Sequence, residues 1–410
     1  MDFLTLLFLG LMFVGIYVTT MFILLTIQNS DRMFKYPVPN EAYSITVIIP
    51  AYNEEKSISS TIKHVVNSNY SNVKILVVND GSNDKTSDIV KKLCKKYKNL
   101  KLLDKSNSGK ADSLNCALKS VKTDLFAVVD SDSFPAKTSL KKLSGYFDDT
   151  KMGAVTSFVK LRNQHDNFLT KLQAVEYILM GWSRKLLDFI DSVYVTNGPL
   201  SLYRTKFVKK IGGFDPESIT EDIDITWNLM RHGYKTSMCL DANVTTVAPN
   251  TLKSFYRQRT RWGLGGIQAL FKYKGEILRR NLFGSFVIPF VMLSIGVSVI
   301  GFILLFLTVG RDISIKLINA GLLKSSNIGI FQKNLVNLTP PVILYLLVFL
   351  AISSIIYFTY VLTQTKGRFE KIHSFNNFFN LLFYIFVYLA IYPIVWFSSI
   401  FRFITGDYRW

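Results

Sequence analysis

The chain has 410 residues, of which 49% are hydrophobic, and it carries a formal net charge of +19. The hydrophobic fraction is high for one soluble domain, and the length predicts two or three structural units. Its three cysteines, Cys94, Cys116 and Cys239, are far apart and include no CxxC pair, so neither a disulfide framework nor a zinc site is expected. No nucleic-acid motif accompanies the basic residues, which favours a domain on the positive-inside face of a membrane.

The first predicted element is a membrane helix. Residues 1–29 contain no Lys or Arg, and Phe3–Ile27 is apolar and long enough to cross a bilayer. The segment has neither a basic n-region nor a small-residue cleavage site, so a retained signal anchor fits better than a cleaved signal peptide. We expect residues 1–29 to form a transmembrane helix and residues 30–250 to form a soluble domain.

Apolar runs alternate with amphipathic helices in the next part of the chain. Strands are predicted at Ile45–Ile49, Val73–Val78, Leu100–Leu103 and Leu125–Val129, and helices at Glu54–Asn69, Asp84–Tyr97 and Gly109–Ser120. This alternation predicts an α/β domain whose parallel sheet is covered by helices on both faces. Ligands of such sheets bind at the carboxyl ends of the strands, where Asp80 and Asp130 stand.

Three polar blocks follow these strands. Pro50–Glu54 contains an aromatic residue that can stack on a base, although it also fits a simple turn. Asn79–Ser82 offers Asp80 as an acceptor for a uracil or ribose donor, or as a helix N-cap. Asp130–Ser131–Asp132 suits Mg²⁺ or Mn²⁺ bound together with substrate phosphates. A metal-free acidic turn is the alternative for this last block, although two carboxylates so close together are costly without a counter-ion.

Two further blocks lie nearer the second apolar region. Thr220–Asp222 precedes a predicted helix, so its carboxylates either cap that helix or include a general base, which we assign to Asp222. Gln258–Trp262 (QRTRW) places two guanidiniums beside an indole. Arg is suited to phosphate contacts and a Trp face to a sugar ring, whereas a cluster at the membrane interface is the alternative.

Two long helical stretches and three more apolar segments complete the chain. Residues 164–190 and 251–281 fit either helices at the membrane surface or ordinary core helices. The region 282–410 is predicted to contain membrane segments at Leu282–Val309, Val342–Thr363 and Phe378–Ile400, with an external loop over Arg311–Leu338 and a basic cytosolic loop over Lys366–Lys371.

The polar blocks, in this order and between membrane segments, resemble the processive inverting glycosyltransferases of the cellulose, chitin, hyaluronan and poly-N-acetylglucosamine synthase family. The resemblance covers roughly residues 43–280. It implies a nucleotide-sugar-binding domain of the A type, with a Rossmann-like mixed sheet, embedded in an α-helical, multi-pass protein of the cell membrane. The catalytic domain would then face the cytosol.

The resemblance implies a role for each matching residue. Positions expected to bind the nucleotide are Ala51, Tyr52, Glu54, Asp80, Lys110, Asp130 and Arg261. Those expected to bind the acceptor are Asn197, Gly198, Pro199, Gln258, Arg259 and Trp262. Asp130 and Asp132 would hold Mg²⁺ or Mn²⁺, and Asp222, beside Glu221, would be the catalytic base.

The implied reaction is metal-dependent transfer from an α-linked UDP-sugar to a growing polysaccharide, with inversion to a β-linkage. Asn197–Leu200 resembles the chitin and hyaluronan branches, whereas Thr220–Asp222 resembles the cellulose and poly-N-acetylglucosamine branches, so the sugar stays open, with UDP-N-acetylglucosamine favoured. Membrane lipids and a small accessory membrane subunit are further expected partners; nucleic acid is not.

Two other functions are considered for the chain. A non-processive enzyme that acts on a lipid-linked acceptor would share the fold but usually lacks the Gln-x-x-Arg-Trp block. A catalytically inactive export subunit would not need intact acidic blocks.

The C-terminal end departs from a simple topology. Four full spans would place both termini outside, yet Arg402–Trp410 resembles basic, aromatic tails that return to a cytosolic active site. Because Pro393 interrupts the last apolar segment, we expect one segment to be re-entrant or interfacial.

Overall fold

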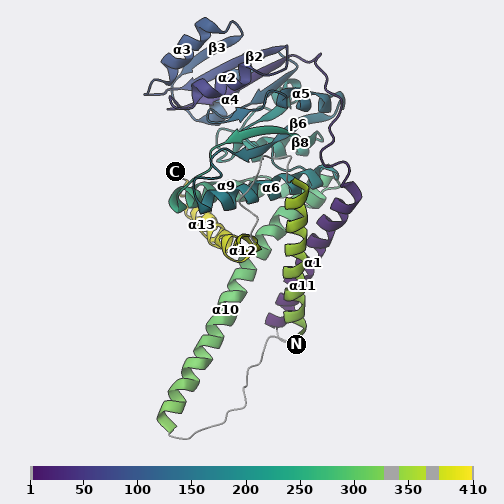
Figure 1. The fold of residues 1–410 in the computed structure, drawn as a ribbon, viewed down its shortest axis with the longest axis vertical. Coiled ribbons are helices and arrows are strands. Elements are labelled where there is room, and N and C mark those ends of the chain that lie inside the picture. The colour runs from purple at the N-terminus through teal and green to yellow at the C-terminus, as the bar shows by residue number, and fades with distance from the viewer. Residues whose placement is uncertain (1–2, 327–340, 366–377, 409–410) are drawn as a thin grey trace.

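The computed structural model describes residues 3–326, 341–365 and 378–408. Figure 1 shows three tiers: an α/β domain, a layer of two helices beneath it, and long helices that project away from that layer. The middle layer consists of α6 (Phe168–Asp188) and α9 (Leu252–Lys272). The projecting helices are α1 (Phe3–Asn29), α10 (Ile288–Ser326) and α11 (Pro341–Thr365).

The α/β domain is built on one eight-stranded sheet with the order β3-β2-β1-β4-β7-β6-β8-β5. Its first half is parallel and consists of β1 (Ile45–Ala51), β2 (Val73–Asp80), β3 (Leu100–Lys105) and β4 (Leu125–Val128). All four predicted strands are therefore confirmed. Strand β1 lies between β2 and β4, with Ile45 opposite both Val73 and Leu125.

The second half of the sheet makes it mixed. It contains β5 (Phe134–Pro135), β6 (Met152–Leu161), β7 (Ser201–Arg204) and β8 (Lys235–Thr246). Strand β7 runs antiparallel to both β4 and β6, and β5 runs antiparallel to β8. The parallel sheet predicted from the alternation is confirmed for the first four strands, and the mixed sheet implied by the resemblance is confirmed for the whole.

Successive residues of β1 point to opposite, buried faces of the sheet. Ile45, Val47 and Ile49 pack in one apolar cluster with residues of α2 (Ile58–Val66) and α3 (Thr86–Lys96). Ile48 packs on the other side, with residues of α4 (Lys110–Ser120), α7 (Thr205–Lys210) and α8 (Glu221–Arg231). A short helix, α5 (Ser139–Ser144), also covers the first face. Both faces are therefore covered, as predicted for continuous apolar strands.

Helix α6 is a core helix. Its Trp182 is 2% exposed and packs edge-on against both Phe34 and Tyr360, so protein covers the apolar face of this helix. The helix begins at Asn167, whose side chain accepts a hydrogen bond from the Thr170 amide. Of the two alternatives for the 164–190 stretch, the structure favours the core helix.

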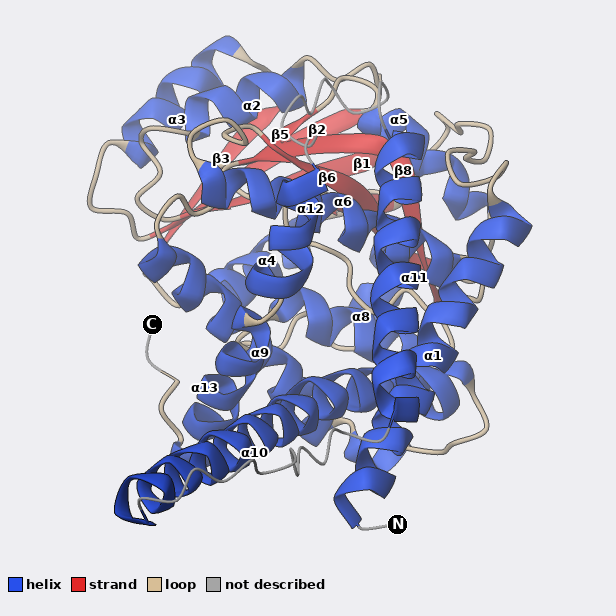
Figure 2. Cartoon of the chain, turned by 60° about the horizontal axis from the view of Figure 1, so that its bottom comes forward, coloured by secondary structure: helices blue, strands red, loops and turns tan. Residues whose placement is uncertain are grey.

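Four helical stretches among the described residues are long and apolar enough to cross a membrane: Thr5–Asn29, Phe283–Ile318, Tyr345–Thr365 and Leu381–Thr405. Helices α1 and α11 lie side by side in both overall views (Figure 2). Helix α10 has 39 residues, which at about 1.5 Å per residue is roughly 58 Å, nearly twice the ~30 Å hydrocarbon core.

Helix α10 runs to Ser326, so the predicted loop over Arg311–Leu338 was wrong up to that residue. Residues 311–326 contain no proline, so no local residue of that kind ends the helix. The predicted basic loop over Lys366–Lys371 lies outside the described residues.

The last apolar segment is broken into α12 (Phe378–Phe383), a π-helical turn over Tyr384–Tyr388, and α13 (Ile391–Thr405). Helix α13 packs along α9, where the Ser399 hydroxyl donates to the Thr260 carbonyl and the rings of Phe271 and Phe403 lie 4.7 Å apart. The described C-terminal end lies beside α9, close to the α/β domain (Figure 1). This arrangement fits the expected re-entrant or interfacial segment better than four simple spans.

Candidate active site

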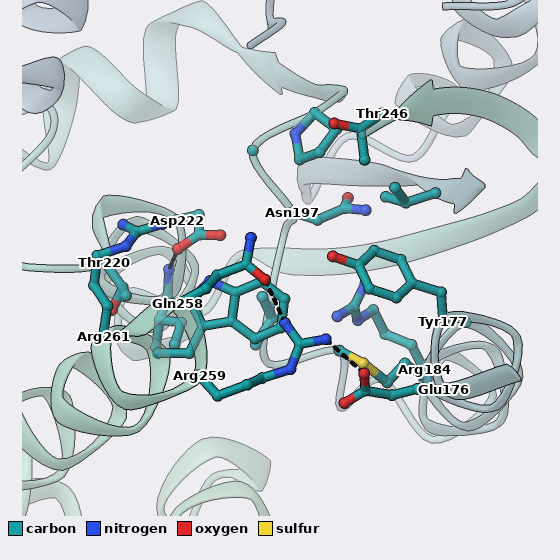
Figure 3. Close-up of a pocket in the computed structure, with 18 of the residues that line it drawn as sticks. Glu176, Tyr177, Arg184, Asn197, Thr220, Asp222, Thr246, Gln258, Arg259 and Arg261 are labelled. Carbon is teal, nitrogen blue, oxygen red and sulfur yellow. Dashed lines mark hydrogen bonds and ion pairs between the residues drawn. The ribbon is translucent and has the colours of Figure 1, made fainter. Parts of the chain in front are cut away.

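A cavity of about 630 Å³ lies between the α/β domain and the C-terminal segment. Its size falls within the roughly 300–1,000 Å³ that is usual for small-molecule sites. The predicted site residues that line it are Lys110, Asp130, Asp132, Asn197, Gly198, Pro199, Glu221, Asp222, Gln258, Arg259, Arg261 and Trp262. The fold thus brings five separate sequence blocks together around one space (Figure 3).

Lys110 connects two of the predicted carboxylates. Its ammonium lies 2.6 Å from Asp130 Oδ1 and 2.6 Å from Glu221 Oε1, at the start of α4. Burial disfavours the charged ammonium, but the two carboxylates outweigh it and raise the pKa of Lys110. The backbone of Gly198 lies against this pair, because a Cβ added there would be 2.8 Å from Asp130 Oδ2. Any larger residue at this position would displace the ion pair.

Asp132 lies two residues beyond Asp130, at the end of the same strand. Burial, the charge of Asp130 and that of Glu54 raise the pKa of Asp132 to about 6. No cluster of three or more His, Cys, Asp or Glu side chains occurs in the described part of the chain. Two close carboxylates, with one of them destabilised as an anion, fit a divalent cation that takes its remaining ligands from phosphate oxygens and water.

Glu221 and Asp222 begin helix α8 and have opposite pKa shifts. Burial would raise the pKa of Glu221, but the neighbouring Lys110 ammonium outweighs burial and lowers it. Burial and the charge of Glu221 raise the pKa of Asp222 to about 6. One oxygen of Asp222 accepts a hydrogen bond of 2.9 Å from the Ile223 amide. Asp222 can therefore exchange a proton near neutral pH, whereas Glu221 stays ionised.

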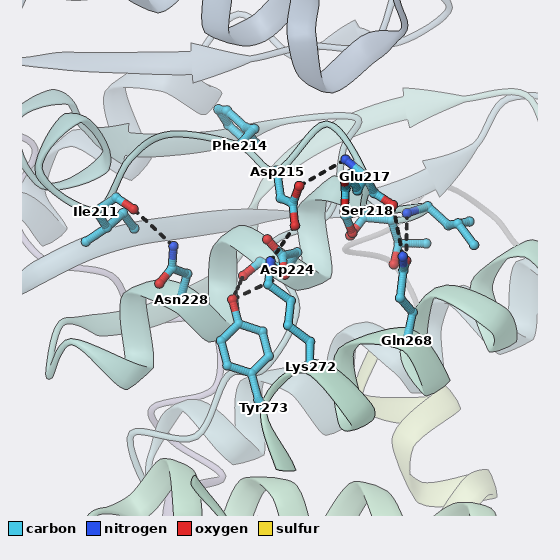
Figure 4. Close-up of polar contacts among 12 residues, drawn as sticks. Ile211, Phe214, Asp215, Glu217, Ser218, Asp224, Asn228, Gln268, Lys272 and Tyr273 are labelled. Carbon is cyan, nitrogen blue, oxygen red and sulfur yellow. Dashed lines mark hydrogen bonds and ion pairs between the residues drawn. The ribbon is translucent and has the colours of Figure 1, made fainter. Parts of the chain in front are cut away.

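Helix α9 holds the segment that carries Asp222. Gln268 accepts from the Ile219 amide at 3.0 Å and donates to the Glu217 carbonyl at 2.9 Å (Figure 4). One helical turn further on, the Lys272 ammonium lies 2.7 Å from Asp215 and 2.6 Å from Asp224. These contacts attach the loop before α8, and α8 itself, to α9.

The two helices also approach closely at Thr220, directly before Glu221. A Cβ added at Gly265 of α9 would lie 2.7 Å from the Thr220 Cβ, a distance that forces one of the two segments to move. The position of Asp222 thus depends on a glycine in another helix.

The QRTRW block divides into two kinds of residue. Arg259 is 1% exposed and forms an ion pair of 2.5 Å with Glu176 of α6. Its guanidinium also donates to the Tyr392 hydroxyl, and the Tyr388 hydroxyl donates to Glu176 at 2.6 Å. Arg259 therefore joins α6 and α9 to the broken C-terminal segment.

Gln258, Arg261 and Trp262 line the cavity as well. Gln258 accepts from Arg259 at 2.6 Å, and the Trp262 ring lies 4.2 Å from the Arg259 guanidinium. Arg261 donates to the Ile219 carbonyl at 3.5 Å. The predicted acceptor loop adds Asn197, whose amide side chain donates to the Ser157 carbonyl.

Four predicted nucleotide-binding residues do not line the cavity. Ala51 is buried at the end of β1, Tyr52 is 48% exposed, and Glu54 accepts from the Ser57 hydroxyl. Asp80 is 4% exposed and accepts from Lys105 at 2.6 Å and from the amides of Ser108 and Gly109. Burial alone would raise the pKa of Asp80, but these bonds outweigh it and lower the pKa. Asp80 thereby holds the loop that precedes Lys110.

Some lining residues were missed from the sequence. The side chains in question are Glu176, Tyr177, Arg184, Tyr194, Tyr384, Tyr392 and Trp396. One signal was available: Glu176 stands within an apolar helical stretch, and a buried carboxylate requires a cationic partner. The aromatic residues of the C-terminal segment could not be identified in this way, since aromatic residues are common in membrane helices.

The chain is similar to known glycosyltransferases. A family model described as "Glycosyltransferase like family 2" matches residues 39–265. A poly-beta-1,6-N-acetyl-D-glucosamine synthase of Staphylococcus aureus (strain COL) is 29% identical over 254 residues, 61% of each chain. A probable glycosyltransferase of Bacillus subtilis (strain 168) is 31% identical over 250 residues, 58% of this chain and 59% of that protein. The match thus spans about three fifths of the length of these relatives.

A solved structure shares the fold over nearly the whole chain. It is a mannosyltransferase from Pyrobaculum calidifontis in complex with GDP-Man and Mn²⁺, with a TM-score of 0.59 and 16% sequence identity. It covers 97% of this chain and 99% of that one.

Proposed function

Since the chain belongs to glycosyltransferase family 2, we propose that it is a membrane-embedded processive β-glycosyltransferase. It polymerises a UDP-activated sugar, with UDP-N-acetylglucosamine as the favoured donor, and passes the polysaccharide across the membrane. The name of the staphylococcal relative supports the choice of sugar. The observation that carries the proposal is a single cavity that is lined both by Asp130, Asp132 and Asp222 and by Trp262 and residues of the C-terminal apolar segment.

The proposed reaction is one displacement with inversion. Asp222 accepts the proton of an acceptor hydroxyl, whose oxygen attacks the anomeric carbon of the donor as the bond to UDP breaks. The raised pKa of Asp222, about 6, suits this role because the carboxylate is mostly ionised at pH 7 and still basic enough to take a proton. Lys110 keeps Glu221 and Asp130 in place beside the reacting groups.

Asp130 and Asp132 are the residues that would hold Mg²⁺ or Mn²⁺. A divalent cation held there supplies charge neutralisation for the departing diphosphate. Arg261 points its guanidinium into the same cavity as Asp222, where it can donate to phosphate oxygens. The Mn²⁺ in the structure of the archaeal mannosyltransferase supports a metal of this kind.

The proposed orientation places the α/β domain in the cytosol, with the polymer leaving past the C-terminal segment. Tyr384, Tyr392 and Trp396 of that segment line the cavity, which supports a path from the reacting groups toward the apolar helices. The alternative, transfer of one sugar to a lipid-linked acceptor, predicts a product of one added residue.

The test is UDP release by the purified protein in detergent, with a panel of UDP-sugars and either Mg²⁺ or Mn²⁺. We expect release from UDP-N-acetylglucosamine, loss of activity with EDTA, and products of many sugar units. Products limited to a single transferred sugar would favour the lipid-linked alternative, and no release from any UDP-sugar would overturn the proposal.

A further inference from the structure

Arg184 of α6 is a cation of the cavity wall with no anionic partner. Among the described residues its guanidinium forms no hydrogen bond and no ion pair, although it lines the cavity. The other basic residues of the wall are engaged: Lys110 with two carboxylates, Arg259 with Glu176, and Arg261 with a carbonyl. A guanidinium carries five N–H donors, so Arg184 leaves them available to a ligand.

The carboxylates near Arg184 do not neutralise it. Glu176, on the same helix, is taken by Arg259 and Tyr388. The one carboxylate whose charge acts on Arg184 is Asp222, and burial nevertheless lowers the pKa of the arginine. Tyr177 and Tyr194 are the other ionisable groups that face it. Within the described part of the chain, the Asp222 carboxylate accepts one hydrogen bond, from the Ile223 amide.

The cavity therefore presents an available acceptor and an available donor on different walls. Figure 3 shows Asp222 and Arg261 on the left of the cavity and Tyr177 and Arg184 on the right. A neutral sugar fits both, because one hydroxyl can donate to Asp222 while a second oxygen accepts from Arg184. The diphosphate fits Arg184 less well, since Asp130, Asp132 and Arg261, which suit a metal and phosphate, lie just after β4 and on α9 rather than on α6.

We propose that Arg184 binds the terminal sugar of the acceptor and orients its reacting hydroxyl toward Asp222. This inference rests on the proposed function and adds to it a residue that was not among the predicted acceptor positions. Tyr177, beside Arg184, supplies an aromatic face against which a sugar ring can lie. Arg184 would thus help to select which hydroxyl attacks.

The test compares Arg184→Gln with Arg257→Gln in the full chain in detergent. Arg257 lies on α9, is exposed and is not part of the cavity wall, so it controls for the loss of one surface charge. A pentasaccharide of β-1,6-linked N-acetylglucosamine is the acceptor probe, varied at saturating UDP-N-acetylglucosamine. The binding of UDP with Mn²⁺ is measured separately.

We expect Arg184→Gln to raise the KM for the pentasaccharide by about tenfold or more, as for the loss of a hydrogen bond from a charged group. The Kd for UDP should stay within about twofold of the unmodified protein, and Arg257→Gln should change neither. Arg184→Lys keeps the charge, so its KM for the pentasaccharide should lie between those of the unmodified protein and Arg184→Gln. This variant is used instead of Arg184→Gln if the latter lowers the unfolding midpoint.

Two results would overturn the inference. One is an unchanged KM for the pentasaccharide in both Arg184 variants. The other is a loss of UDP binding as large as the loss of acceptor binding, which would assign Arg184 to the diphosphate. Failure of the unmodified protein to release UDP is a separate result, which would remove the proposed function itself.

Discussion

The two ends of the cavity are built from different kinds of contact. At the carboxylate end, Asp130, Asp132 and Asp222 stand at the ends of a strand and a helix, and the side chain of Lys110 is 34% exposed. At the end next to the membrane helices, Arg259 and Glu176 are 1% and 5% exposed and are surrounded by aromatic rings.

Carboxylates at the first end can change their charge. Arg259 and Glu176 at the second end instead hold the α/β domain and the C-terminal membrane segment together. With pKa values of about 6, Asp132 and Asp222 can take up or release a proton near neutral pH. The ion pair of Arg259 is closed off from solvent and has no such freedom. A motif that reads as one block, QRTRW, therefore contributes both a ligand-facing surface and a structural link.

The largest expected effect is at the carboxylate end. Replacing Asp222 by Asn keeps the shape of the side chain but removes the proposed catalytic base, so UDP release should fall by about 10²–10⁴-fold. The unfolding midpoint should not decrease, because the buried, destabilised anion becomes a neutral amide. Asp166→Asn, at an exposed site outside the cavity, is the control and should keep full activity. An active Asp222→Asn enzyme would remove the assignment of the base.

The opposite pattern is expected at the membrane end. Arg259→Met leaves Glu176 buried without its cation, which typically costs about 3–5 kcal/mol. The unfolding midpoint in detergent should drop sharply, whereas Arg257→Met, on the exposed side of the same helix, should change stability by no more than ~0.5 kcal/mol. Adding Glu176→Gln to Arg259→Met should recover part of the loss. If Arg259→Met unfolds like Arg257→Met yet no longer binds acceptor, Arg259 is a ligand residue and the contrast between the two ends fails.

Two adjacent glycines of α9 can test whether the packing of α9 against the start of α8 positions Asp222. Gly265→Ala places a methyl group 2.7 Å from the Thr220 Cβ, whereas a Cβ at Gly266 meets nothing within 4 Å. We expect Gly265→Ala to displace the start of α8 and lower kcat about tenfold, as a small misplacement of a reacting group does. Gly266→Ala should keep activity and stabilise the helix by up to ~1 kcal/mol. Equal activity of the two variants would show that α9 does not position Asp222.

Much of the carboxylate end could be predicted from the sequence because it depends on local patterns. Asp130 and Asp132 follow an apolar run, and Asp222 begins an amphipathic helix, so their placement at element ends follows from the strands and helices themselves. The first four strands could be predicted for the same reason. Strand β7 could not be predicted, since it has four residues and runs antiparallel to its neighbours.

The membrane end could not be predicted because its contacts join distant parts of the chain. Tyr388 lies 212 residues from Glu176, and Tyr392 lies 133 residues from Arg259. Nothing in an apolar segment indicates which of its tyrosines will meet a buried ion pair. The role of Asp80 was also hidden, because its partners Ser108 and Gly109 approach it only when β2 and β3 pair.

The smallest effect is expected from pH, and it separates the two ends without a mutation. Asp222 must be ionised to accept a proton, so with a pKa of about 6 its active fraction should fall by about half between pH 7.5 and 6 and about tenfold by pH 5.

Because the folded pKa values of Asp132 and Asp222 are raised, the native state takes up protons in this range, and these two groups make it more stable as the pH falls. Burial opposes the charge of Arg259, but Glu176 outweighs burial and raises the pKa of that guanidinium, so it stays charged throughout. Activity should therefore decline from pH 7.5 to 6 while the unfolding midpoint holds or rises. A midpoint that falls together with kcat would mean that acid loosens the fold, and the loss of activity could then not be assigned to the carboxylate end.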